Sequence, residues 1–181
     1  MRAVVGLGNP GEEYAATRHN AGFWLADALV ARWGFPPFRR GERARVTEGE
    51  VAGVPVRVLK PTTYMNRSGA ALASLRADPA FDPATELLIL VDDFQIPAGT
   101  FRFRMEGSAG GHNGLKSVEG ALQSTAFARL RIGVGPLPDN IGDWADYVLV
   151  PADPEQREQI DQLIPKMAET VERWLQGGTP T

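Results

Sequence analysis

The chain contains no cysteine and only two histidines, and it has no long run of apolar residues. Without cysteine it can form no disulfide, cannot use a thiol nucleophile and offers no cysteine ligand to a metal. No apolar run approaches the length of about 18 residues that a transmembrane helix requires. The N-terminus enters a strand pattern at once and lacks a signal-peptide layout. We therefore expect a cytoplasmic protein whose 181 residues form one domain, residues 1–181.

An excess of positive charge is also missing. The net charge is −3, which argues against a broadly basic nucleic-acid-binding protein. The charge is uneven, because residues 132–181 contain nine acidic and three basic side chains and the positive excess lies before them. This asymmetry is compatible with a basic face and an acidic tail, and equally with a solvated acidic helix near the C-terminus.

The order of the predicted elements is typical of an α/β protein. Leu87–Val91 is apolar throughout, which predicts a central strand covered on both faces. Gly53 marks a hairpin and hence some antiparallel pairing. We expect a mixed, partly parallel, twisted sheet sandwiched between helices. Strands are expected at 3–7, 44–51, 54–59, 87–91, 100–104 and 130–134, and more weakly at 147–150; helices at 21–33, 68–77, 115–123 and 154–175; and a surface loop at 34–45.

The stretch VVGLGNPGEEYAATRHNAGF, residues 4–23, contains glycines with the spacing of a dinucleotide-binding turn, G-x-G-x-x-G. That function requires a helix to begin at the glycines. Pro10 disfavours helical geometry at Asn9, and the helical pattern begins only near Ala21. We therefore interpret the glycines as shaping a tight loop that presents Asn9.

Four polar clusters lie at predicted strand ends or in loops. Ligands of open α/β sheets collect beyond the carboxyl ends of the strands, and three of the clusters follow strands. We therefore expect these three to meet on one rim. The clusters are Asn9 with Arg18-His19-Asn20, Thr62–Asn66, Asp92-Asp93 and, before a helix, Gly107–Gly114.

Each of these residues alone has an ordinary structural explanation, because His19, Asp92, Asn66 or His112 can cap a helix or a turn. Together they match the needs of a hydrolytic site without a side-chain nucleophile. Histidine supplies a base near neutral pH, and aspartate holds its tautomer and stabilises the imidazolium. Asparagine amides can hold a peptide-like substrate and an oxyanion.

Five segments together resemble the bacterial type of peptidyl-tRNA hydrolase. The resemblance implies an α/β esterase that is monomeric and needs no metal or other cofactor. Its implied partner is peptidyl-tRNA, whose ester between peptide and 3′ ribose it would cleave to recycle the tRNA; no DNA or membrane partner is implied. The segments, co-linear with the family between residues 3 and 135, are VVGLGNPGEEYAATRHNAGF, KPTTYMNRSG, DDFQIP, GSAGGHNGLKS and RLRIGVG.

Motif position also implies roles for individual residues. His19 corresponds to the general base and Asp92 to the acid that supports it. Asn9 matches the residue that helps to select peptidyl over free aminoacyl groups. Arg104 and Arg131 fall where the family directs basic side chains toward tRNA phosphate. The other matched positions would contact substrate, and these are Tyr14, Tyr64, Met65 on the floor of the site, Asn66, His112 and Asn113.

Two features depart from the family pattern. Gln95 stands where an acid or a small polar residue is common. The resemblance therefore implies no role for a second carboxylate at this position, and it leaves Asp92 unaffected. The segment Pro151–Thr181 adds little to the match and is shorter than the family's usual tail, so no tRNA contact is carried over to it.

Positive charge gathers near the matched segments. On alternating strands, Arg102 shares a face with Arg104, and Arg129 shares a face with Arg131. Together with Lys116, these side chains predict a local basic patch beside the site, with arginine suited to phosphate oxygens.

Two other functions fit parts of the pattern. A metallohydrolase would bind its metal through His19, His112, Asp92 and Asp93, although the chain has no H-x-x-x-H pair. A non-catalytic RNA-binding module would need no general base, and the chain has both His19 and Asp92. The combined pattern favours the esterase.

Overall fold

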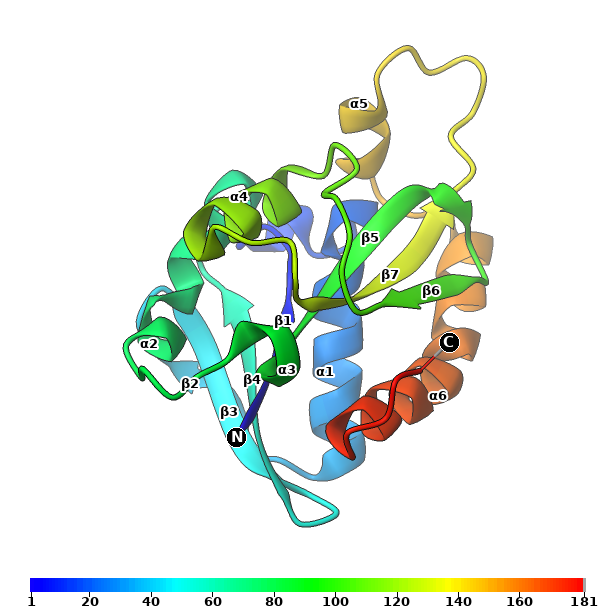
Figure 1. Ribbon diagram of the computed structural model, residues 1–181. Helices are drawn as coiled ribbons and strands as arrows, with labels where there is room; N and C mark the ends of the chain where they lie inside the picture. Colours follow the sequence, from blue (N-terminus) through cyan, green and yellow to red (C-terminus); the bar gives the residue numbers. More distant parts are fainter. Residues whose placement is uncertain (181) are drawn as a thin grey trace.

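A seven-stranded mixed sheet forms the centre of the protein in the computed structural model, which describes residues 1–180 (Figure 1). The strand order is β2-β3-β4-β1-β5-β7-β6. The central strands β4, β1, β5 and β7 pair in parallel, whereas the pairs β2–β3, β3–β4 and β6–β7 are antiparallel. The strands are β1 (Arg2–Gly6), β2 (Arg39–Arg40), β3 (Ala44–Val51), β4 (Val54–Pro61), β5 (Leu87–Pro97), β6 (Phe101–Arg104) and β7 (Ala128–Gly135).

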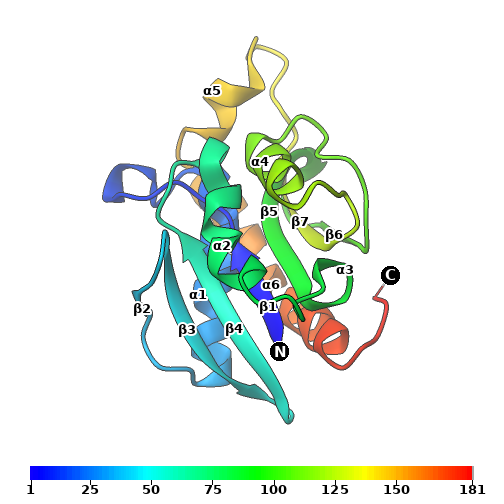
Figure 2. The ribbon, with the colours of Figure 1, turned by 60° about the vertical axis from the view of Figure 1, so that its left-hand side comes forward.

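Helices cover both faces of this sheet (Figures 1 and 2), which confirms the expected fold class. The long helices α1 (Ala21–Trp33) and α6 (Pro154–Leu175) lie on one face. The other face carries η3 (Met65–Leu72), α2 (Ala73–Arg76) and α4 (Asn113–Leu122). No helix within residues 1–180 combines the length and the apolar character needed to cross a bilayer. The short helices are η1 (Glu12–Tyr14), η2 (Arg18–Asn20), α3 (Pro83–Glu86) and α5 (Trp144–Val148).

The continuous apolar run in β5 serves both layers. Successive side chains of a strand point to opposite faces, so Leu88 and Leu90 pack under α1 and α6. Leu87, Ile89 and Val91 face the layer of η3 and α4. All five side chains are buried, as the sequence predicts for a central strand.

Two expectations about local structure are wrong. Tyr147–Val150 is not a strand, because Asp143 caps α5 by accepting from the Ala145 N–H and the helix runs through Val148. The phenol of Tyr147 also donates to Val134 O at 2.7 Å. The expected loop at 34–45 contains the short strand β2, because Arg39 and Arg40 pair with the edge of β3, whose bounds are as expected.

The glycines of the first loop allow the backbone of α1 to approach the strand ends. A Cβ at Gly8 would lie 2.8 Å from the ring of Phe23, and a Cβ at Gly6 would meet the Gly22 carbonyl. Gly11 has a φ of 104°, which favours glycine. The glycines thus bring the start of α1, with the residues that precede it, against the ends of β1 and β5.

Replacing Gly22 by alanine should destabilise the protein. The new Cβ would lie 2.6 Å from Leu7 O and against Leu90 O, and both are backbone atoms that cannot move alone. We expect the free energy of unfolding to fall by about 1–3 kcal/mol, measured by urea denaturation. Gly120→Ala is the control, because no atom lies within 4 Å of its added Cβ and alanine favours a helix. Equal stability of the two variants would contradict this account.

Candidate active site

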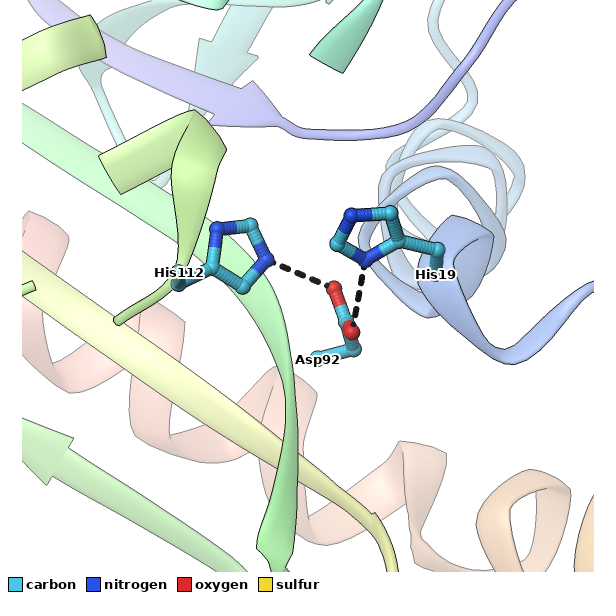
Figure 3. Close-up of side chains that lie close together, drawn as sticks. All are labelled: His19, Asp92 and His112. Atoms are coloured by element: carbon cyan, nitrogen blue, oxygen red, sulfur yellow. Dashed lines mark hydrogen bonds and ion pairs between the residues drawn. The ribbon is translucent and has the colours of Figure 1, made fainter. Parts of the chain in front are cut away.

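A hydrogen bond between His19 and Asp92 lies at the centre of the site. His19 stands in η2, just before α1, and Asp92 lies within β5, which continues beyond the point where the apolar run suggests its end. His19 Nδ1 lies 2.8 Å from Asp92 Oδ2 (Figure 3). The ring therefore donates from Nδ1, and its Nε2, directed away from Asp92, is left as the basic nitrogen.

His112 holds the other oxygen of the same carboxylate. Its Nε2 lies 2.9 Å from Asp92 Oδ1 (Figure 3). Its Nδ1 accepts from the backbone N–H groups of Gly114 and Leu115 and so caps α4. These partners assign the ring hydrogen to Nε2. Both nitrogens of His112 are thus engaged inside the protein.

The surroundings move the pKa values of His19 and Asp92 in opposite directions. Burial acts to lower the pKa of His19, but the charge of Asp92 and its hydrogen bond outweigh burial, so the pKa is raised above its ordinary value. Burial acts to raise the pKa of Asp92, yet its interactions with both histidines hold this pKa far below the usual range. Asp92 is therefore ionised, and it stabilises a protonated His19.

Asn9 is oriented by two neighbours. Its Oδ1 accepts from Met65 N at 2.7 Å, and its backbone N–H and C=O pair with the Asn20 side chain at 2.8 and 3.0 Å. Because Oδ1 is bonded to an N–H, the amide Nδ2 is the free end of the side chain. The sequence places Asn20 in the first polar cluster, directly after His19, but no motif predicts that its side chain holds the backbone of Asn9.

A cleft of about 220 Å³ lies over His19. Tyr64 is 59% exposed at its edge and meets Tyr14 edge-to-face, with 6.3 Å between ring centroids. Leu149 also lines the cleft and is 43% exposed; no motif pointed to it, because its position depends on the fold of α5. The lining residues are Asn9, His19, Tyr64, Met65, Asn66, Asn113 and Leu149. The structure thus brings together every expected peptide-site residue except Tyr14, at the edge, and His112, behind Asp92.

Arg18 connects η2 to the segment that carries Leu149. Its side chain is 5% exposed and donates to the carbonyl of Tyr147 at 3.1 Å and to Gln156 Oε1 at 3.0 Å. The guanidinium also stacks on the ring of Tyr147. The wall of the cleft around Leu149 is therefore fixed relative to His19.

The expected basic patch is only partly at the surface. Arg102 and Arg104 are exposed on β6. Arg131 is mostly buried, with Nη2 donating to Ser108 O at 2.7 Å and Nη1 lying 3.7 Å from Asp93 Oδ2. Arg129 is fully buried among backbone carbonyls, and burial lowers its pKa to about 10. The inclusion of Arg129 in a surface patch is therefore wrong, because the segment before α4 folds over it.

The side chains of His19, Asp92 and His112 are also close enough together to hold a metal ion. Ligand atoms of His19, Asp92 and His112 lie within 4.8 Å of one another. A metal requires the lone pair of each ligand nitrogen, whereas His112 Nε2 and His19 Nδ1 both donate to Asp92. A metal would have to break this hydrogen-bonded group, so the arrangement favours proton transfer.

Comparisons of the sequence and of the fold with known proteins both match peptidyl-tRNA hydrolases. The family model described as Peptidyl-tRNA hydrolase matches residues 3–181. Peptidyl-tRNA hydrolase of Gemmatimonas aurantiaca is 44% identical over 181 residues, which cover 99% of this chain and 95% of the relative. That of Chloroflexus aggregans is 45% identical over 172 residues, covering 95% and 91%. The crystal structure of peptidyl-tRNA hydrolase from Acinetobacter baumannii has a TM-score of 0.90 at 35% identity, covering 98% of this chain and 89% of that one.

These matches extend through the sheet, both helical layers and all four polar clusters. An ester hydrolase built on this fold accounts for the buried carboxylate, the free imidazole nitrogen and the amides around them. The chain belongs to the peptidyl-tRNA hydrolase family.

Proposed function

We propose that the protein hydrolyses the ester bond between peptide and tRNA in peptidyl-tRNA released from or stalled on ribosomes, and so recycles the tRNA. The observation that carries this proposal is the 2.8 Å bond between His19 Nδ1 and Asp92 Oδ2, which leaves His19 Nε2 free to act as a base. A cytoplasmic monomer that needs no metal or cofactor and binds neither DNA nor a membrane is part of the same proposal.

In the proposed reaction, His19 Nε2 takes a proton from water as the water oxygen attacks the ester carbonyl. Asp92 stabilises the imidazolium that forms. The amides of Asn66 and Asn113, which also line the cleft, donate to the developing oxyanion. Collapse of the tetrahedral intermediate breaks the bond to the ribose 3′ oxygen, which receives the proton from His19. The products are the free peptide and tRNA.

His112 acts through Asp92 in this scheme. Its two nitrogens are occupied by Asp92 and by the first turn of α4, so it has no atom to offer to the substrate. It holds the carboxylate in the orientation that His19 requires and compensates part of the cost of burying this charge. His112 is therefore a positioning residue rather than the substrate contact that its motif implies.

Asn9 selects for a blocked amino group. Its Nδ2 is a hydrogen-bond donor, because Met65 N already occupies Oδ1. A peptide or formyl group presents a carbonyl oxygen to this donor. A free aminoacyl ester presents an ammonium group, which is a donor itself and leaves Nδ2 unpaired, and such a mismatch disfavours binding strongly.

Removal of the base or of its carboxylate should lower turnover in different ways. His19→Ala should reduce kcat by about 10²–10⁴-fold, the contribution of a positioned general base. Asp92→Asn should also lose rate, and the acidic limb of its pH–rate profile should move to lower pH, because the interaction that raises the pKa of His19 is lost while burial remains. The measurement is hydrolysis of N-acetyl-aminoacyl-tRNA over a pH series.

Circular dichroism should show that both variants are folded. A chelator in the assay tests the metallohydrolase alternative, which requires loss of activity on metal removal. Wild-type turnover in His19→Ala would contradict the role of His19 as general base. An unshifted pH–rate profile with an unchanged rate in Asp92→Asn would contradict the role of Asp92 in supporting it.

Asn9→Asp should impair discrimination between blocked and free substrates. The aspartate keeps the acceptor for Met65 N but replaces the amide donor by a negative oxygen, which attracts an ammonium group. We expect the ratio of kcat/KM for N-acetyl-aminoacyl-tRNA over aminoacyl-tRNA to fall by about tenfold or more, the effect of about 1.4 kcal/mol. An unchanged ratio would mean that Asn9 serves only the turn.

Arg104 and Arg131 are proposed to contact tRNA phosphate. Arg104→Ala and Arg131→Ala should each raise KM for the tRNA substrate and reduce the slope of log affinity against log salt by about one. Hydrolysis of a short ester without the tRNA body should barely change. Equal effects on both substrates would instead show that these side chains have a structural role, which for Arg131 is its hydrogen bond to Ser108 O.

A further inference from the structure

Three basic side chains form a row across the strands next to the cleft. Arg40 on β2 is directly opposite Arg45 on β3, and Arg45 is directly opposite Lys60 on β4. Residues paired in this way in an antiparallel sheet project from the same face. β2 and β6 are the opposite edges of the sheet (Figure 2), so the row is separate from the arginines of β6 and β7.

This row is electrostatically unfavourable as it stands. Like charges directly opposite each other destabilise a sheet. Lys60 is paired with Asp27 at 2.6 Å, but within residues 1–180 no carboxylate forms an ion pair with Arg40 or Arg45. The neighbouring Arg39 and Arg57, in contrast, share Glu48. The row therefore has positive charge available for an anionic ligand.

A hollow of about 270 Å³ lies between two members of the row and Asn9. Arg45 and Lys60 line one side, and Asn9, which also lines the cleft over His19, lines the other. Phe23 and Trp24 supply apolar surface between them, and Asp27 is the one carboxylate among the lining residues. The hollow thus begins at the residue proposed to hold the acyl group and ends at Lys60, which is paired with Asp27, and at Arg45, which has no ion pair within residues 1–180.

We propose that this hollow binds the peptide part of the substrate upstream of the esterified residue, and that Arg45, with Arg40 and Lys60, favours peptides with an acidic side chain there. This inference rests on the proposed function. A peptide held at Asn9 by its carbonyl extends away from the ester, and the hollow is the adjoining space that Asn9 shares. Apolar walls with a basic end suit a peptide backbone and a carboxylate.

The position of the row favours a peptide over RNA. The proposed phosphate contacts lie beyond β5 in the sheet, on the other side of the cleft from β4. A substrate whose tRNA body lies over β6 and β7 directs its peptide toward β4 and β3. The ammonium group of Lys60 is also recessed, with a side chain 19% exposed, and it lies over the ring of Phe38.

The test uses the full chain and three substrates on one tRNA, N-acetyl-Glu-Ala, N-acetyl-Gln-Ala and N-acetyl-Lys-Ala esters. We expect kcat/KM to fall in that order, with about a fivefold difference between Glu and Lys, the size of effect of a partly exposed charge pair. Arg45→Gln should reduce this difference to less than about twofold. Arg45→Glu should reverse it.

Arg39→Gln is the matched control, because Arg39 lies next to Arg40 on β2 but is 58% exposed and paired with Glu48. It should leave the ratio between the Glu and Lys substrates unchanged. Thermal unfolding gives a second readout, since Arg45→Gln relieves repulsion within the row and should not lower Tm.

Two outcomes would overturn the inference. Equal kcat/KM for the three substrates with the wild-type protein would show that the hollow does not discriminate between peptides by their charge. An equal loss on all three substrates in Arg45→Gln, with a reduced salt dependence, would assign the row to tRNA phosphate. Either result leaves hydrolysis itself intact, whereas failure of the proposed function would appear as no hydrolysis of any of the three.

Discussion

The buried carboxylate of Asp92 is the constraint on which the rest of the site depends. A charge removed from water costs several kcal/mol unless hydrogen bonds replace its hydration, and Asp92 is 2% exposed. Its two oxygens are satisfied from opposite directions, by His19 from the segment before α1 and by His112 from the start of α4. Elements more than 90 residues apart in sequence must therefore meet at one side chain.

This convergence requires backbones to approach closely. The glycines at 6, 8 and 22 remove the side chains that would hold α1 away from the strand ends. Arg18, next to His19, then ties the same short helix to α5 and α6 through carbonyl and amide oxygens. His19 is thus supported from the sheet, from α1 and, through Arg18, from α5 and α6.

Much of the fold follows from local sequence patterns. The apolar run of β5, the hairpin at Gly53 and the long stripes of α1 and α6 each carry their own periodicity, and the structure confirms these elements. The strand predicted at Tyr147–Val150 is wrong because the apolar side chains there do not distinguish a short capped helix from a strand. The burial of Arg129 could not be read from alternation, since it depends on a distant segment that covers β7.

Most residues of the candidate site can be predicted from the sequence, but the roles of their individual atoms cannot. Residue type and strand position single out His19 and Asp92, which the structure has in contact. Their neighbours' roles depend on single backbone groups far away in sequence. Met65 N sets the direction of the Asn9 amide, and the first N–H groups of α4 set the tautomer of His112. No sequence pattern encodes which atom of an amide or imidazole remains free.

One consequence follows from the position of His112 as both a helix cap and a partner of Asp92. The first turn of α4 and the ionised carboxylate are joined through a single ring, so they are thermodynamically linked. Any interaction that orders this turn also stabilises the ionised Asp92, and the ionised Asp92 stabilises the turn by the same free energy. In the proposed function, substrate binding at Asn113 and the placement of His19 are therefore coupled through this one ring.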